Sequence, residues 1–147
     1  MANIDKALSI AVQAHSGQRD RYGRHYILHP LRVMHKVTTD REKIVAILHD
    51  IIEDTDWTTG QLGAEGFSPE IIQAVDALSK RENESYVDYI ERLMDNPLAV
   101  IVKLADLEDN MDIHRIEAFT EEDGKRLARY HRTWEKLIKT TEDTAGR

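Results

Sequence analysis

Four residues near the middle of the chain combine an imidazole with three carboxylates within six positions. They are His49, Asp50, Glu53 and Asp54. On one continuous helix over about 41–54, Glu53 would lie about 40° from His49, Asp50 about 100° and Asp54 about 140°. Carboxylates so close repel one another unless a cation or protons compensate, and the last turn of a helix disfavours acids. A divalent metal site is therefore predicted, with a solvated acidic helix end as the alternative.

A second group of polar residues lies in an otherwise apolar segment, VKLADLEDN. Asp106 is flanked by aliphatic residues, and Lys103, Asp109 and Asn110 fall on the same side of the expected helix. A carboxylate in a buried helix needs a partner. An arginine would serve as a structural partner, whereas coordination of a metal beside His49 would be functional, and the segment alone leaves both open.

A third group lies in the polar, glycine-containing segment 16–29. His29 stands directly before a proline, where a helix can begin. Arg19, Arg21 and Arg24 precede it. These arginines are candidates for cradling phosphates, or they are simply exposed to solvent.

The elements that must position these residues are predicted to be helices throughout. Ile4, Leu8, Val12 and His15 form one stripe of a first helix. Cap and proline signals start later helices, with Asp40 expected as one of the caps. The predicted segments are 30–37, 41–54, a short helix ending at 65, 69–80, 85–95, 97–113 and 121–140. Without an alternating strand, the chain is predicted to be a single all-α domain over residues 1–147, with its metal site inside a helix bundle.

Composition narrows the function classes. The chain has 147 residues, 41% hydrophobic, 32% charged and no cysteine, which excludes disulfide scaffolds, cysteine zinc sites and cysteine nucleophiles. The net charge is −7, although residues 14–43 hold seven basic and three acidic side chains. Such a balance suggests a small anionic ligand more than nucleic acid, although composition alone favours a solvated surface of mixed charge. No apolar run approaches a membrane span and no secretory signal is visible, so we expect a cytoplasmic protein without membrane contact.

Three motifs together carry a resemblance to a known family. The strings AHSGQ with YGRHYILHP, then LHDIIED, then VKLADLEDN are similar to the HD-domain hydrolases of the RelA/SpoT group, and most of all to stand-alone small alarmone hydrolases. The resemblance covers about Ala7 to Met111. It implies an all-α HD fold and hydrolysis of the 3′-pyrophosphate of (p)ppGpp to GDP or GTP and pyrophosphate, usually with Mn²⁺.

The resemblance also implies roles for individual residues. The metal ligands would be His29, His49, Asp50 and Asp106, a donor set that suits a divalent ion with positions open for water. Glu53 and Asp54 would orient or deprotonate the attacking water. The expected substrate-binding residues are Arg21, Arg24, Lys103 and Asn110, of which Asn110 matches the family's asparagine near the sugar or phosphate.

Two departures from the family pattern bear on the substrate. Asp20 stands where a basic residue is usual, so only Arg21 remains to stack on a purine. Leu107-Glu108-Asp109 replaces the usual Arg-Leu-His, which is expected to make the nucleotide side more acidic. The alternatives are therefore (p)ppApp or another nucleotide as substrate and, in a different class, an alarmone-binding regulator or antitoxin. The sequence does not indicate the oligomeric state.

Overall fold

A computed structural model describes residues 1–145, and within them the only regular elements are helices. The all-α prediction is thereby confirmed, and residues 146 and 147 of the predicted domain lie outside the described range. A 3-10 helix, η1, spans Ile113–Arg115. The α-helices are α1 Ile4–Ala14, α2 Leu28–His35, α3 Asp40–Leu48, α4 Ile51–Asp54, α5 Thr59–Ala64, α6 Pro69–Ala77, α7 Tyr86–Met94, α8 Pro97–Asn110 and α9 Glu121–Ala145.

The cap signals read from the sequence start three helices as predicted. The side chains of Ser68, Ser85 and Asn96 each accept a hydrogen bond from a backbone N–H three residues on, which satisfies one of the free donors of the first turn. Prolines follow Ser68 and Asn96 at the first helical position. These helices therefore begin where local chemistry requires.

The cap of α3 was predicted one residue too late. Thr39, not Asp40, accepts from the backbone N–H of Glu42, and the Glu42 carboxylate accepts in return from the Thr39 N–H. This reciprocal pair satisfies two donors, which a single Asp40 side chain would not do. The start of α3 is thus fixed by a capping box.

Several predicted helix ends were wrong. The helix expected over 41–54 stops at Leu48, and a separate four-residue helix, α4, begins at Ile51. The helix expected over 97–113 ends at Asn110, before η1. The C-terminal helix expected over 121–140 instead continues to Ala145.

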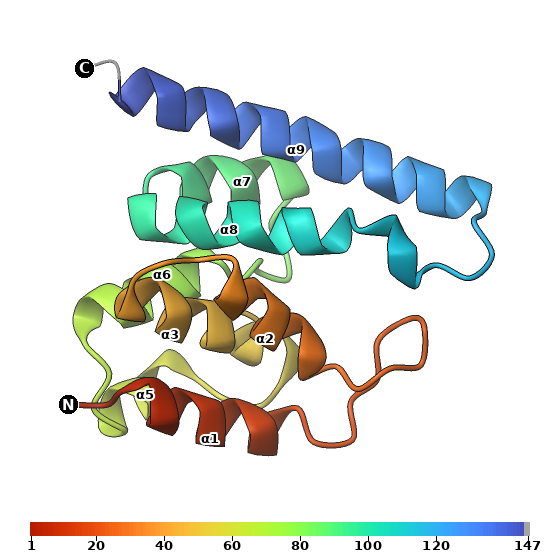
Figure 1. Cartoon of the computed structure of the whole chain (residues 1–147). Coiled ribbons are helices and arrows are strands. Elements are labelled where there is room, and N and C mark those ends of the chain that lie inside the picture. Colours follow the sequence, from red (N-terminus) through yellow and green to blue (C-terminus); the bar gives the residue numbers. More distant parts are fainter. Residues whose placement is uncertain (146–147) are drawn as a thin grey trace.

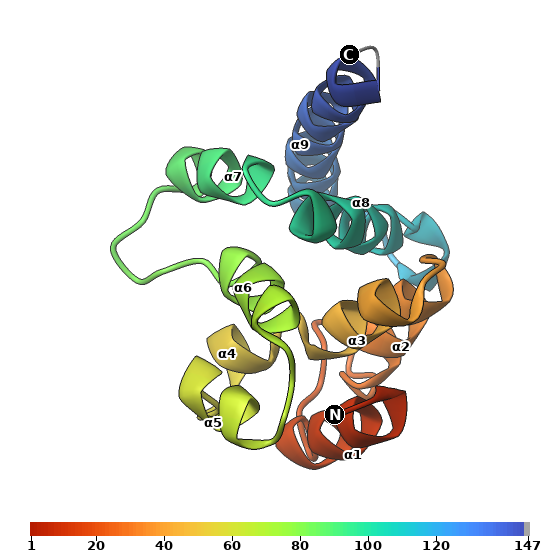
Figure 2. The same ribbon diagram turned by 90° about the vertical axis from the view of Figure 1, so that its left-hand side faces the viewer.

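The helices pack around α3, whose residues Ile44 to Leu48 are all buried. Helices α1, α2, α6 and α8 contact α3, and α9 contacts α7 and α8. Figure 1 shows α1 and α9 at opposite ends of the stack, and Figure 2 shows the 78–85 connection bulging away beside α6 and α7. The site helices α2, α3 and α8 therefore meet in the interior.

The buried face of α1 differs from the predicted stripe. Ala7, Ile10 and Ala11 are buried, whereas Val12 is 53% exposed. Ile4 and Leu8 of the predicted stripe pack against the core and His15 is buried, so Val12 is the member that the prediction misplaced. In the described part of the chain, no helix has the length and apolar character needed to cross a membrane.

Candidate metal centre and its cavity

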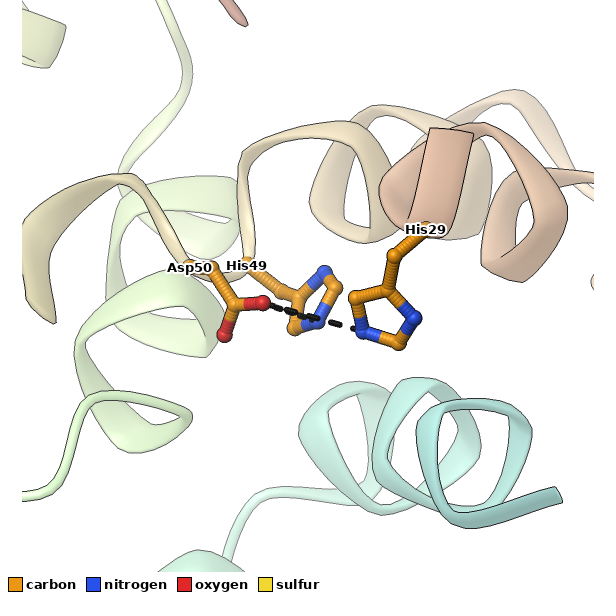
Figure 3. Close-up of side chains that lie close together, drawn as sticks. All are labelled: His29, His49 and Asp50. Atoms are coloured by element: carbon orange, nitrogen blue, oxygen red, sulfur yellow. Dashed lines mark ion pairs between the residues drawn. The ribbon is translucent and has the colours of Figure 1, made fainter. Parts of the chain in front are cut away.

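Three separate segments bring the predicted metal ligands together. His29 lies in the first turn of α2, His49 and Asp50 occupy the joint between α3 and α4, and Asp106 lies in the middle of α8. His29, His49 and Asp50 each offer a donor atom within 4.8 Å of the others. Figure 3 shows the two imidazoles and the carboxylate pointing toward one another from α2 and the joint.

The joint between α3 and α4 is what aims His49 and Asp50. Asp50 has φ −100° and ψ 0°, the bridge region in which the chain leaves one helical path before starting another. The sequence argument placed His49, Asp50, Glu53 and Asp54 on one arc of a continuous helix, and that geometry was wrong. The break, not a shared helical face, turns His49 and Asp50 toward α2 and α8.

The spacing of the donor atoms suits a single cation. His29 Nε2 lies 2.9 Å from Asp106 Oδ1 and 3.7 Å from Asp50 Oδ2. His49 Nε2 lies 3.0 Å from Asp50 Oδ2 and 3.5 Å from Asp106 Oδ1. Two ligands about 2.1 Å from a shared ion stand roughly 3.0–3.4 Å apart, so these four side chains fit a divalent metal.

The outer nitrogen of each imidazole is already engaged. His49 Nδ1 donates to the backbone carbonyl of Ala46 at 2.6 Å, and His29 Nδ1 lies 2.7 Å from Asp109 Oδ2. In the neutral rings the Nε2 lone pairs then face the cluster. His49 Nε2 is buried and has no hydrogen bond of normal geometry in the described structure. A buried lone pair of this kind is what a metal ligand presents.

The electrostatics of the cluster favour positive charge. Burial alone would lower the pKa of His29 and His49, but hydrogen bonds and charges of the neighbouring carboxylates raise both above the ordinary value. Burial would raise the pKa of Asp50 and Asp106, but the imidazoles hold the pKa of Asp50 low, and Lys103 together with the imidazoles holds that of Asp106 low. The same field that draws protons to the imidazoles attracts a divalent cation.

Lys103 and Asn110 hold the Asp106 carboxylate from the same helix. Lys103 Nζ lies 2.9 Å from Asp106 Oδ2, and Asn110 Nδ2 donates to Oδ1 at 3.1 Å. The ammonium also lies 5.4 Å from the ring centre of Tyr89. Both residues were predicted to bind substrate, and both do line the cavity above the cluster, while also orienting Asp106.

Glu53 and Asp54 lie on α4, beside the cluster. Glu53 Oε1 accepts a 2.7 Å hydrogen bond from the backbone N–H of Lys80, and Asp54 Oδ2 accepts from Gln18 at 3.4 Å. Partial burial and the charge of Asp50 raise the pKa of both carboxyls. A carboxylate with a raised pKa is a stronger base, which suits proton transfer at neutral pH.

A cavity of about 450 Å³ opens above the cluster. Four arginines and one lysine line it, together with tyrosines and the cluster's own carboxylates. Of the predicted site residues, His29, Asp50, Glu53, Asp106, Arg21, Lys103 and Asn110 line it. Arg24 instead lines a smaller neighbouring cavity of about 160 Å³ beside Arg115 and Tyr22. The prediction for Arg24 therefore holds only if the ligand reaches that second space.

The chain is similar to several curated proteins with names taken from guanosine polyphosphate metabolism. A protein of Aquifex aeolicus named guanosine-3′,5′-bis(diphosphate) 3′-pyrophosphohydrolase is 31% identical over 138 residues, 86% of this chain and 19% of its own length. A Vibrio cholerae protein of the same name is 33% identical over 135 residues, 82% and 19%. A Myxococcus xanthus protein named GTP pyrophosphokinase is 30% identical over 143 residues, 85% and 18%.

The fold agrees with these relatives. A solved structure described as a metazoan ortholog of SpoT that hydrolyzes ppGpp superposes with a TM-score of 0.75 at 23% identity, over 95% of this chain and 85% of that one. The chain is a RelA/SpoT-type HD domain. It spans about a fifth of the length of the curated relatives it matches, and no protein-family model matches it.

The structure shows what the two departures from the RelA/SpoT pattern, at Asp20 and at residues 107–109, contact. The Asp20 carboxylate accepts from the backbone N–H groups of Tyr22 and Arg24, at 2.9 and 3.0 Å, and so holds its own loop in shape. Asp109 is 1% exposed, and Glu108 faces Trp134. Neither Glu108 nor Asp109 lines the cavity, whereas Asp20 does.

Sequence reasoning missed several residues of this RelA/SpoT-type site. Tyr26 donates from its hydroxyl to Asp50 and lines the cavity, and burial together with the charge of Asp50 raises its pKa. Arg32 and Arg115 supply two of the cavity's cations. Their partner Asp109 lies three residues after Asp106, on the same face of α8, and that spacing was a usable signal.

Proposed function

We propose that this chain is a metal-dependent hydrolase that removes the 3′-pyrophosphate from guanosine tetra- and pentaphosphate, with Mn²⁺ as the working ion. One observation carries the proposal. Two imidazole Nε2 atoms and two carboxylates converge at the floor of a cavity whose walls carry four arginines and a lysine. A divalent ion and several phosphates fit these opposite charges, and the names of the relatives point to guanosine.

In this proposal His29, His49, Asp50 and Asp106 hold the ion. When bound, a divalent metal lowers the pKa of a coordinated water and polarises a phosphate oxygen. The protein fixes the donors in advance: Asp109 and the Ala46 carbonyl hold the imidazoles, and Lys103 and Asn110 hold Asp106. The floor of the cavity is thus organised before substrate arrives.

Glu53 is the proposed general base. Its Oε1 is held by the Lys80 backbone N–H, which leaves Oε2 to accept a proton from the attacking water. Asp54, with its raised pKa, orients that water from the same short helix. As the new P–O bond forms, the bond between phosphorus and the 3′-oxygen breaks. The 3′-oxygen takes up a proton, so the products are a 3′-hydroxyl and pyrophosphate.

The wall of the cavity binds the phosphates. Arg19, Arg21, Arg32 and Arg115 all line it, and guanidinium groups pair well with phosphate oxygens. The enclosed space and the net charge of −7 favour a small nucleotide over a nucleic acid. Arg21 is the proposed residue for contact with the purine.

The proposal is tested by pyrophosphate release from ppGpp and ppApp in parallel, using metal-stripped protein with and without Mn²⁺. Release from ppGpp only with Mn²⁺ is expected. Release from ppApp alone would replace guanosine by adenosine. No release from either, by folded protein shown to bind Mn²⁺, would overturn the hydrolase proposal in favour of a binding role.

The role of Glu53 is tested by Glu53→Gln. Glutamine has nearly the same shape and keeps an oxygen that can accept from the Lys80 N–H, but it cannot act as a general base. We expect kcat to fall about 10²- to 10⁴-fold, the range of general base catalysis, with nucleotide binding retained. Glu108→Gln is the matched control, because Glu108 is exposed on α8 and does not line the cavity. An unchanged kcat in Glu53→Gln would remove the assigned role.

A further inference from the structure

Asp109 is a buried carboxylate whose partners all come from outside its own turn of α8. It is 1% exposed. Its Oδ2 lies 2.7 Å from His29 Nδ1, and its Oδ1 accepts from Arg32 Nε at 2.8 Å and lies 3.4 Å from Arg115 Nη1. A buried carboxylate with fewer partners would be costly to keep charged. Both of its oxygens are therefore committed.

The contacts of Asp109 tie three elements together at the metal cluster. His29 and Arg32 lie three residues apart on one face of α2, and Arg115 ends η1. Arg115 Nη2 also donates to the Asp109 backbone carbonyl at 2.8 Å. The two arginines fix the plane of the carboxylate, so its Oδ2 is presented to the imidazole in one direction.

The two imidazoles of the cluster are held by different kinds of acceptor. His49 Nδ1 donates to a backbone carbonyl of its own helix, that of Ala46, which no single side-chain substitution removes. The Nδ1 of His29 has no such acceptor in its own helix. It instead contacts the side chain of Asp109, which lies on α8. Because His29 Nε2 lies 2.9 Å from Asp106 Oδ1, a rotated ring would take its ligand atom away from the cluster.

We propose that Asp109 is a positioning residue that sets the tautomer and ring orientation of His29 and thereby the affinity of the cluster for its cation. The inference rests on the proposed function only where the cation is concerned. The RelA/SpoT pattern has a histidine at this position, so the carboxylate is a feature of this chain. Partners of this kind typically contribute 10- to 100-fold to metal affinity.

The test compares Asp109→Asn, which keeps an acceptor oxygen, with Asp109→Leu, which has none. Glu84→Gln is the matched control: Glu84 forms an ion pair with Arg92 at 2.8 Å and is outside the residues that line the main cavity. Mn²⁺ dissociation constants are measured by the EPR signal of the free ion. The protonated nitrogen of His29 is read from ¹⁵N shifts in metal-free protein, at a pH where the ring is neutral.

We expect the Mn²⁺ dissociation constant to rise about 10-fold in Asp109→Asn and about 100-fold in Asp109→Leu. The proton of His29 is expected to leave Nδ1 for part of the population in the leucine variant, and Glu84→Gln should match wild type in both readouts. If Asp109→Leu does not fold, the asparagine variant alone decides.

Wild-type affinity together with an unchanged His29 tautomer in Asp109→Asn and any folded Asp109→Leu would overturn the inference. A lower melting temperature with unchanged affinity would reduce Asp109 to a structural contact and would overturn it equally. Wild-type protein that binds no Mn²⁺ would instead defeat the proposed function. The tautomer measurement would then still decide whether Asp109 orients the ring.

Discussion

The floor and the wall of the cavity are built in different ways. The floor consists of His29, His49, Asp50 and Asp106, which come from packed helices and from the joint between α3 and α4. The wall includes the loop over residues 16–27, whose shape is kept by its own short-range hydrogen bonds. Packing fixes the floor through the whole core, whereas the loop combines its own backbone hydrogen bonds with side-chain contacts from Gln18 to Asp54 and from Tyr26 to Asp50.

Much of the loop's shape comes from its own residues. Gly17 and Gly23 have φ of +83° and +79°, which other residues rarely adopt, and Asp20 bonds the loop's backbone. Its contact with distant sequence includes the Tyr22 hydroxyl and Asp123 of α9 at 3.4 Å. Changes in the floor should therefore affect metal binding and stability together, and changes in the wall should affect substrate binding alone.

The largest effect is expected from Asp106→Asn. The change weakens the metal site and leaves Lys103, whose side chain is 12% exposed, without its carboxylate partner. We expect Mn²⁺-dependent activity to fall more than about 100-fold, beyond the usual effect of a residue that only supports a ligand. The free energy of unfolding should fall by about 3–5 kcal/mol, as when one partner of a buried pair is removed.

Metal titration and urea unfolding followed by circular dichroism check this prediction, with Asp88→Asn, exposed on α7, as the control. A folded Asp106→Asn protein that binds Mn²⁺ as tightly as wild type would exclude Asp106 from the floor.

Metal addition should stabilise the wild-type protein through the same residues. At an ion concentration 100 times the dissociation constant, the free energy of unfolding should rise by about 2.7 kcal/mol, because the ion binds the folded state. Urea unfolding with and without Mn²⁺ measures this gain, with KCl at equal ionic strength as control. An equal gain in Asp106→Asn would show that the ion binds elsewhere.

A wall substitution should separate binding from chemistry. Arg21 lines the main cavity but is not part of the metal cluster. In Arg21→Ala we expect KM for ppGpp to rise about 10-fold, the effect of losing one hydrogen bond to a charged group, with kcat nearly unchanged. Steady-state kinetics provide the measurement, and Arg24→Ala should raise KM less because Arg24 lines the neighbouring cavity. A fall in kcat alone would contradict the division between floor and wall.

The smallest effect is expected from Tyr22→Phe, which removes the hydroxyl that reaches Asp123. A hydrogen bond of this length from an exposed tyrosine contributes little, so KM should rise at most about 3-fold and the melting temperature should stay the same. Kinetics and thermal unfolding measure both. If kcat fell 10-fold at constant KM, the Tyr22 hydroxyl would belong to the chemistry.

Local signals predicted much of the helical order. The caps at Ser68, Ser85 and Asn96 act within four residues, so their effect is visible in the sequence itself. The break at His49 and Asp50 was missed because apolar residues continue on both sides of it. Nothing local distinguishes a helix that continues from one that turns to meet α2 and α8.

The site was predicted mainly through the family resemblance, since periodicity alone left the role of Asp106 open. Contacts such as that between Asp109 and His29 join residues 80 positions apart, and only the packing of α2 against α8 creates them. Asp20 and Asp109 were both interpreted as acidic groups facing the nucleotide. In the structure each accepts hydrogen bonds from N–H donors, and Asp20 also lines the main cavity whereas Asp109 does not.

The joint between α3 and α4 also determines what a substitution at Asp50 can teach. The side chain of Asp50 belongs to the metal cluster, while its backbone carbonyl accepts the N–H of Asp54 and so closes the single turn that carries Glu53. Asp50 therefore contributes a metal ligand through its side chain and positions Glu53 through its backbone. A substitution at Asp50 removes the carboxylate but keeps this carbonyl, so a lost activity would report the missing metal ligand while the turn that carries Glu53 stays closed.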